Sequence, residues 1–82
     1  MRKEMIQDLL VRFGFAETLN KVMLGVNLAH VIHVNPDGAG RLVEYYADPA
    51  GIVRAIWVFD MGPQSVGLIE SVPDFEIWLG GY

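Results

Sequence analysis

Cysteine is absent from this chain of 82 residues, so neither a disulfide nor a thiolate-bound zinc ion can stabilise its fold. A domain of this length buries only about 60% of the surface that its unfolded chain exposes, which leaves a thin margin of stability. Association with a second copy is the remaining common way to bury more surface. The absence of cysteine also fits a reducing compartment, and we predict a cytoplasmic protein.

Long apolar runs are missing as well. Asp8 and Arg12 interrupt the segment in which the apolar core of a signal peptide would lie. No run approaches the roughly 18 apolar residues that a membrane-spanning helix needs. We therefore expect a soluble protein without a membrane partner.

Positive charge is scarce in the second half of the sequence. Residues 1–41 carry five basic and four acidic side chains, a net charge of +1, whereas residues 42–82 carry one basic and six acidic side chains, a net charge of −5. Proteins that bind nucleic acids gain affinity mainly from lysine and arginine side chains that neutralise phosphates. The charge distribution therefore argues against direct binding of DNA or RNA.

Motifs of catalysis and of ligand binding are also lacking. The candidate nucleophiles Thr18, Ser65 and Ser71 lie outside any Gly-x-Ser-x-Gly elbow. The segment 38–40, Gly-Ala-Gly, lacks the lysine and the following helix of a phosphate-binding loop, and a hairpin turn explains it better. We predict that the protein is not an enzyme and that it holds no cofactor.

The two histidines, His30 and His33, are spaced as His-x-x-His. On a strand, an offset of three residues directs side chains to opposite faces, so one chain cannot hold a single metal ion with both. We expect one histidine to be partly buried with a hydrogen bond and the other to lie near solvent, and we predict no metal site. The sequence is compatible with an acid–base pair between His33 and Asp60 or Glu44.

The most informative segment that is present, residues 52–60, predicts a strand with two apolar faces. Strict alternation gives two sets of side chains, which are Val53, Ala55, Trp57 and Phe59 on one face and Ile52, Arg54, Ile56 and Val58 on the other. An antiparallel strand with one face in water should instead alternate apolar and polar residues. We therefore expect the second face to be covered by another helical segment or by another copy of the molecule.

The N-terminal quarter predicts helical structure. Over residues 2–13 the apolar side chains recur on one stripe, and Gly14 fits the position that ends a helix. Residues 15–27 fit two structures, because helical spacing and the alternation of a strand overlap there. We expect a short helix at 16–23, a break at Gly25 and a strand over about 27–35.

The remainder of the chain predicts three further strands and a helix. Turn-forming clusters at 35–40, 48–51 and 61–64 separate apolar runs at 41–47, 52–60 and 65–72, and such short connections produce an antiparallel meander. Ser71 and Asp74 have the spacing of a capping box, Pro73 suits a first helical turn, and the glycines at 80 and 81 end the helix. The predicted fold class is α+β, a single domain over residues 1–82. In it, N-terminal helical segments pack on a four-stranded antiparallel meander, with a short C-terminal helix.

These features indicate a small acidic module that binds protein. Aromatic residues are numerous for so small a core, and tryptophan and tyrosine are enriched at interface hot spots. If helix 2–13 covers the side of residue 57, the side chains of residues 56 and 58 remain uncovered, and carboxylates could align across neighbouring strands. The predicted protein-binding residues are Glu44, Tyr46, Ile56, Val58, Asp60, Glu70 and Trp78.

The leading functional hypothesis is a homodimer that binds a protein partner. A more specific version is an inhibitor of a larger basic or nucleic-acid-handling complex, of the kind that phages and other mobile elements encode, with binding that weakens as salt rises. The alternative is a domain that binds a small ligand or catalyses a reaction in a pocket between sheet and helices. Its lining would be Tyr45, Tyr46, Trp57 and a histidine.

Overall fold

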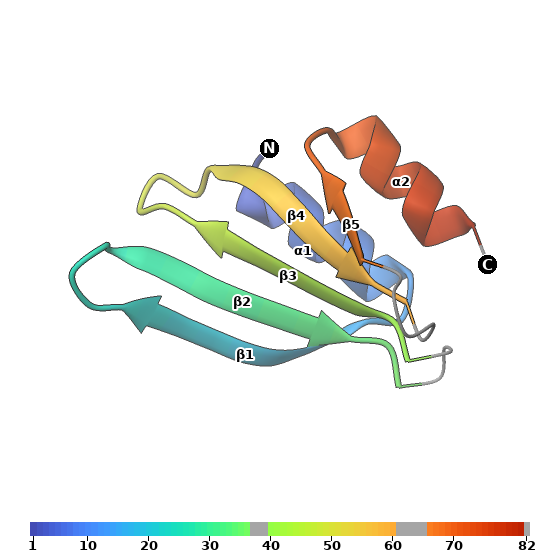
Figure 1. The fold of residues 1–82 in the computed structure, drawn as a ribbon, viewed down its shortest axis with the longest axis horizontal. Helices are drawn as coiled ribbons and strands as arrows, with labels where there is room; N and C mark the ends of the chain where they lie inside the picture. The colour runs from blue at the N-terminus through green and yellow to red at the C-terminus, as the bar shows by residue number, and fades with distance from the viewer. Residues whose placement is uncertain (37–39, 61–65, 82) are drawn as a thin grey trace.

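The computed structural model describes residues 1–36, 40–60 and 66–81, and in them two helices lie against a five-stranded antiparallel sheet (Figure 1). The elements in chain order are α1 (Lys3–Arg12), β1 (Ala16–Met23), β2 (Leu28–Val34), β3 (Leu42–Ala47), β4 (Val53–Phe59), β5 (Val66–Ile69) and α2 (Val72–Gly80). The strands follow one another across the sheet in sequence order. The predicted α+β meander with a helix at each end is thus confirmed, with one strand more than expected.

The additional strand is β1, and the prediction of a short helix at 16–23 is wrong. This segment pairs with β2 from Ala16 opposite Val34 to Met23 opposite Leu28. The chain reverses between the two strands in a turn where Gly25 and Asn27 have positive φ angles of 92° and 55°. Gly25 was therefore correctly predicted as a break, but the ladder with β2 outweighs the helical spacing of the residues before it.

The helix α1 ends where the sequence predicts. Gly14 has a φ of 83°. The N–H of Phe15 donates to the carbonyl of Leu10 (2.8 Å), and the N–H of Gly14 donates to that of Val11 (3.1 Å). This pair of bonds is a Schellman motif, which a glycine at this position favours. At its other end the helix is tied to the sheet, because the N–H of Lys3 donates to the carbonyl of Gly51 (2.8 Å).

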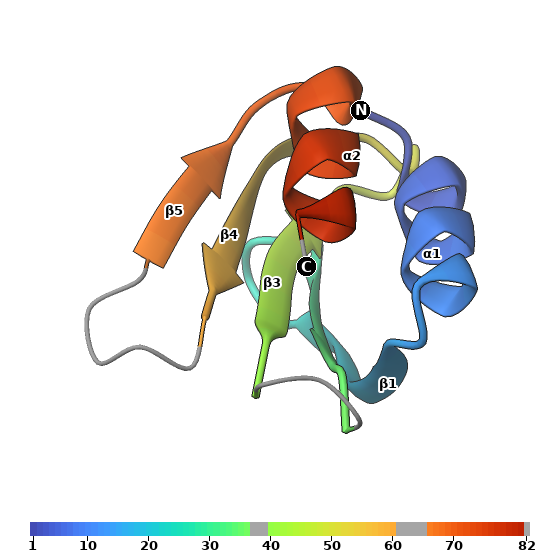
Figure 2. The ribbon, with the colours of Figure 1, turned by 90° about the vertical axis from the view of Figure 1, so that its right-hand side faces the viewer.

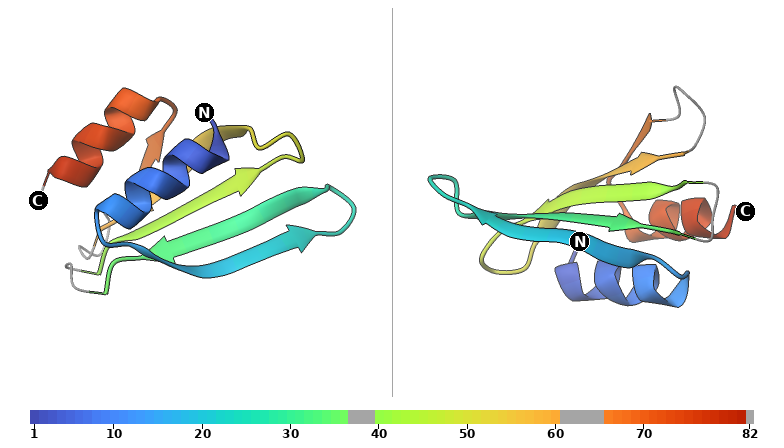
Figure 3. Two further views of the ribbon diagram at one scale, coloured as in Figure 1. Left: turned by 180° about the vertical axis from the view of Figure 1, so that it is seen from behind. Right: turned by 90° about the horizontal axis from the view of Figure 1, so that it is seen from below.

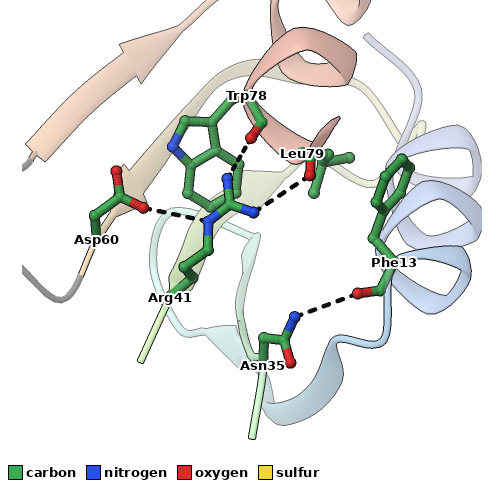
Figure 4. Close-up of polar contacts among 6 residues, drawn as sticks. All are labelled: Phe13, Asn35, Arg41, Asp60, Trp78 and Leu79. Atoms are coloured by element: carbon green, nitrogen blue, oxygen red, sulfur yellow. Dashed lines mark hydrogen bonds and ion pairs between the residues drawn. The ribbon is translucent and has the colours of Figure 1, made fainter. Parts of the chain in front are cut away.

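The helix α2 is held by its N-cap and by a buried arginine. The Ser71 hydroxyl accepts a hydrogen bond from the N–H of Asp74 (3.3 Å), as the capping box predicts. Arg41, only 4% exposed, donates to the carbonyl oxygens of Trp78 and Leu79 at the end of the helix (Figure 4). Its guanidinium carbon lies 3.6 Å from the centre of the Trp78 ring, and its Nε is 3.2 Å from a carboxylate oxygen of Asp60. A cation suits this site, since carbonyl groups make a helix C-terminus negative.

Both helices lie on the same side of the sheet (Figures 2 and 3). The apolar residues Ile6, Leu9 and Leu10 of α1 and Phe75 and Leu79 of α2 are buried in one core with the strands. The sheet contributes Val31, Val43, Tyr45, Ala47, Val53, Ile56, Val58 and Ile69 to that core. We call this side of the sheet the covered face and the opposite side the open face.

A β-bulge in β4 decides which side chains reach each face. Tyr45 lies opposite Ile56 but Ala47 lies opposite Val53, so β4 has one residue more than β3 over this stretch. The additional residue shifts the alternation by one position. Ile56 and Val58 are consequently buried on the covered face, at 0% and 4% exposure. The expectation that these two side chains lie uncovered is therefore wrong, because an alternation pattern does not show a bulge.

Candidate protein interface on the open face

The open face is lined mainly by apolar and aromatic side chains. In an antiparallel sheet, residues directly opposite each other share a face, so the strand register defines its rows. These rows include Ala16, Val34, Leu42 and Phe59; Leu19, Ile32, Glu44, Trp57 and Leu68; Lys21, His30 and Tyr46; and Met23 and Leu28. Figure 3 shows that both helices lie on the other side of these strands. No helix or strand of the described chain covers this face, and Leu68 is 55% exposed.

A cluster of rings and one charged pair occupies the centre of the open face. The His30 ring stacks on Tyr46 with 4.7 Å between ring centres, and Tyr46 meets Trp57 edge-on at 6.0 Å. Nε2 of His30 lies 2.5 Å from a carboxylate oxygen of Glu44, its diagonal neighbour on the adjacent strand. An imidazole–carboxylate pair is therefore present, but it uses His30 rather than His33. Mutual contacts fix these side chains, so the surface is preorganised.

A pocket of about 410 Å³ lies at one end of the open face. Its lining consists of Leu28, Tyr46, Asp48, Ile52, Arg54, Ala55 and Trp57. The Asp48 carboxylate already accepts hydrogen bonds from the N–H groups of Ala50 and Ile52, both at 2.9 Å, and so stabilises the turn before β4. The remaining walls are mainly aromatic and aliphatic, which suits an apolar occupant.

The predicted pocket between sheet and helices is not formed by its predicted lining. Tyr45 and Tyr46 are consecutive on β3 and point to opposite faces, so Tyr45 is buried in the core while Tyr46 lines the pocket of the open face. Trp57 lies beside Tyr46. Only these two aromatic residues of the predicted set meet in one cavity.

His33 and Tyr45 lie on the covered face, where burial changes their ionisation. His33 is 3% exposed, and its Nδ1 has no hydrogen-bond partner among the described residues. Burial lowers the pKa of this imidazole, and the negative charge of Glu17 opposes that change in part. Burial also raises the pKa of the Tyr45 hydroxyl to about 12. His33 is thus a neutral residue of the core.

The predicted division of the two histidines between opposite faces is confirmed, since His30 lies on the open face. Their environments differ from the prediction in one respect. The hydrogen bond belongs to the more exposed His30, whereas the buried His33 lacks one at Nδ1 within the described residues.

The structure divides the seven predicted binding residues among several places. Glu44 and Tyr46 lie together on the open face, whereas Ile56 and Val58 are in the core. The others lie away from that face or at its margin: Asp60 binds Arg41, Trp78 packs against Arg41 on the helix side, and Glu70 is exposed just beyond β5. The row of Glu44 continues to Trp57 and Leu68, so the carboxylates of Glu44, Asp60 and Glu70 do not align across neighbouring strands.

Sequence reasoning missed much of the open face, namely His30, Ile32, Val34, Phe59 and Leu68. A signal for part of it was available. With the turn at 35–40 as the centre of a hairpin, pairing outward brings residue 34 opposite residue 42 and residue 30 opposite residue 46, as observed. The alternation in 28–34 and 42–47 could then have placed His30 beside Tyr46.

The hydroxyl groups considered as nucleophiles have structural roles where they are described. The Thr18 hydroxyl donates to the carbonyl of Ile32 (3.3 Å), and the Ser71 hydroxyl caps α2. Ser65 and the turn residues 37–39 and 61–64 lie outside the described residues. In the part of the chain that the structure describes, no three histidine or acidic side chains gather closely enough to hold a metal ion.

Comparison with known proteins gives no further assignment: no family model, curated protein or solved structure matches this chain. Among the described residues, neither helix has the length and apolar character required to cross a membrane.

Proposed function

We propose that this protein is a non-enzymatic protein-binding module that forms a homodimer through the open face of its sheet. The observation that carries this proposal is an apolar, aromatic sheet face with no helix over it in the described chain. Such a face is costly to leave in water, and large exposed apolar patches mark interaction sites. Tyrosine and tryptophan at its centre, here Tyr46 and Trp57, are the residue types that dominate binding energy at interfaces.

The size of the open face supports a stable interface. Strands lie about 4.8 Å apart and rise about 3.3 Å per residue, so five strands of about six residues cover roughly 500 Å² of flat sheet. The relief of the side chains raises this area toward the roughly 600 Å² per partner at the lower end of specific interfaces. Two such sheets stacked about 10 Å apart form a sandwich in which both open faces become a second core.

The polar residues of the open face are compatible with burial. His30 and Glu44 already bind each other, with side-chain exposures of only 22% and 25%, so a covering sheet leaves neither group unpaired. Burying a hydrogen-bonded pair costs less free energy than burying an isolated charge. Lys21 lies on β1 at the edge of the sheet, where its ammonium group can stay in water.

The experiment compares two glutamate substitutions by sedimentation equilibrium from about 1 to 100 µM protein. Leu68→Glu puts a charge on the open face, whereas Ile77→Glu puts the same charge on α2, on the helix side; both side chains are exposed, at 55% and 72%. We expect the unaltered chain and Ile77→Glu to have twice the 9.1 kDa mass of one chain, and Leu68→Glu to be monomeric. An unaltered chain that is monomeric throughout this range contradicts the proposal.

The salt dependence of association separates this proposal from the hypothesis of an acidic inhibitor. An interface of apolar side chains should change little in affinity between about 50 and 500 mM salt, because screening affects mainly exposed charges. An acidic surface that binds a basic partner should instead lose affinity steeply over that range.

A further inference from the structure

The tip of the β1–β2 hairpin carries an unusual concentration of exposed apolar side chains. Leu24 is 97% exposed, the most of any large apolar residue in the described chain, and Val22 and Val26 are each 56% exposed. The hairpin extends past the ends of the helices, so neither helix can cover its tip (Figures 1 and 3). A turn at this position needs only polar and glycine residues, so its apolar side chains call for a partner.

The pocket of the open face lies at the same end of the sheet as this tip. Leu28 connects them, since it is the first residue of β2 after the turn and also lines the pocket. The turn before β4, which contributes Asp48 to the pocket, lies at that end too (Figure 1). Viewed along the sheet, the tip curves to the side away from the helices, which is the side of the open face (Figure 3).

We infer that the Leu24 tip of one copy inserts into the pocket of the second copy, and reciprocally, in the homodimer. This inference rests on the proposed function, of which it is the more specific form. In a two-fold dimer both copies use the same surface, so that surface must be complementary to itself. A protruding apolar group beside an apolar pocket meets this condition, because the two-fold axis can place the tip of each copy in the pocket of the other. Tyr46 and Trp57 form aromatic walls around the inserted leucine.

The charged groups at the pocket do not oppose an aliphatic occupant. The Asp48 carboxylate is held by two backbone N–H groups, and Arg54 is exposed, so its guanidinium can remain at the rim in contact with water. The volume of about 410 Å³ accommodates the Leu24 side chain together with a neighbouring side chain of the tip.

Because the chain has no cysteine, single cysteines report this contact without background. Leu24→Cys and Ala55→Cys chains are mixed and treated with a short bis-maleimide, so that a 24–55 link can form only between two copies. The matched control mixes Ile77→Cys with Ala55→Cys, since residue 77 lies on the helix side and is also exposed. We expect peptide mass spectrometry to identify the 24–55 link and to find no 77–55 link above the level of random collision.

A second measurement tests the energetic part of the inference. Leu24→Ser should raise the dimer Kd by about 10- to 100-fold, the effect of losing one buried leucine. Val11→Ser, an equally polar change at an exposed residue of α1, should leave Kd unchanged. A dimer with no 24–55 link and an unchanged Kd for Leu24→Ser overturns the insertion of the tip while the dimer itself stands. A chain that never dimerises, or a pocket that binds only another molecule, overturns both.

Discussion

The two faces of this sheet are built from similar side chains but have different surroundings. On the covered face Val31, Val43 and Ile56 have no exposed surface, because the two helices lie over them. On the open face, Ile32, Leu42 and Trp57 come from the same strands and remain partly exposed. Hydrophobicity alone therefore does not specify the core. The helices cover one apolar face, and no helix of the described chain covers the other.

The two histidines also have different environments on the two faces. His30 on the open face forms a close pair with Glu44. His33 on the covered face is buried and has a lowered pKa. Burial favours the neutral imidazole, and the negative charge of Glu17 offsets this effect only in part. Within the described part of the chain, the covered face thus holds its histidine without a charged partner in hydrogen-bond contact, whereas the open face keeps an imidazole–carboxylate pair.

The largest expected effect is on the free energy of unfolding, and it should distinguish the two faces at two consecutive residues of β4. Ile56→Ala should lower the free energy of unfolding by about 3 kcal/mol, because it leaves a cavity in the core. Trp57→Ala should lower it by less than half as much in a monomeric Leu68→Glu background, since its ring is partly exposed there. Urea unfolding of both variants measures the difference. Equal losses would show that the two faces are equally buried within one chain.

The next effect concerns the arginine that holds α2 over the covered face. Arg41→Ala removes hydrogen bonds to two carbonyl groups and to Asp60, and should lower the free energy of unfolding by about 2 kcal/mol. Hydrogen exchange should accelerate in α2 more than in β2 and β3. Arg54→Ala, at an exposed arginine, should change stability by less than about 0.5 kcal/mol. Loss of α2 protection in both variants would contradict this role of Arg41.

The smallest effect is the pH dependence contributed by His33. Its pKa is lower in the folded protein than the ordinary 6.5, so below that pH the unfolded chain binds more protons. Stability should therefore fall as pH drops from about 6.5 to the folded pKa, by up to about 1.4 kcal/mol per pH unit, and should not depend on His33 at higher pH.

The measurement compares urea unfolding of the unaltered chain and of His33→Phe between pH 7.5 and pH 5. The variant keeps a ring beside Tyr45, whose centre lies 6.1 Å from that of His33, and removes the titrating group. The stability difference between the two chains should change only on the acidic side. A difference that stays constant across this range would show that burial does not shift this imidazole.

Most of the fold could be predicted from local patterns. The apolar stripe of α1, the glycine after it, the capping box before α2 and the turn-forming clusters each act within a few residues, and each was interpreted correctly where the structure describes it. The failure at β1 has a different origin. Its residues are compatible with a helix, and only the pairing with β2, which brings residues up to 18 positions apart together, selects the strand.

The candidate site was harder to predict because it depends on register. Glu44 and Tyr46 were placed correctly on one face, since β3 alternates without interruption. Ile56 and Val58 were misplaced by the bulge, which depends on how β3 and β4 pair rather than on either strand alone. The pairing of His30 with Glu44 required the register between β2 and β3. The contacts between strands could therefore not be predicted from the sequence alone.

The bulge in β4 has one last consequence, for the way such a chain could change. The extra residue lets Val53 and Ile56, which are three positions apart, share the covered face. Deletion of Ala55 would therefore remove the bulge and leave a regular strand in which Val53, Ile56 and Val58 still point inward and Trp57 and Phe59 outward. The bulge is thus the feature that lets one strand with irregular alternation keep its aliphatic side chains in the core and its aromatic side chains outside.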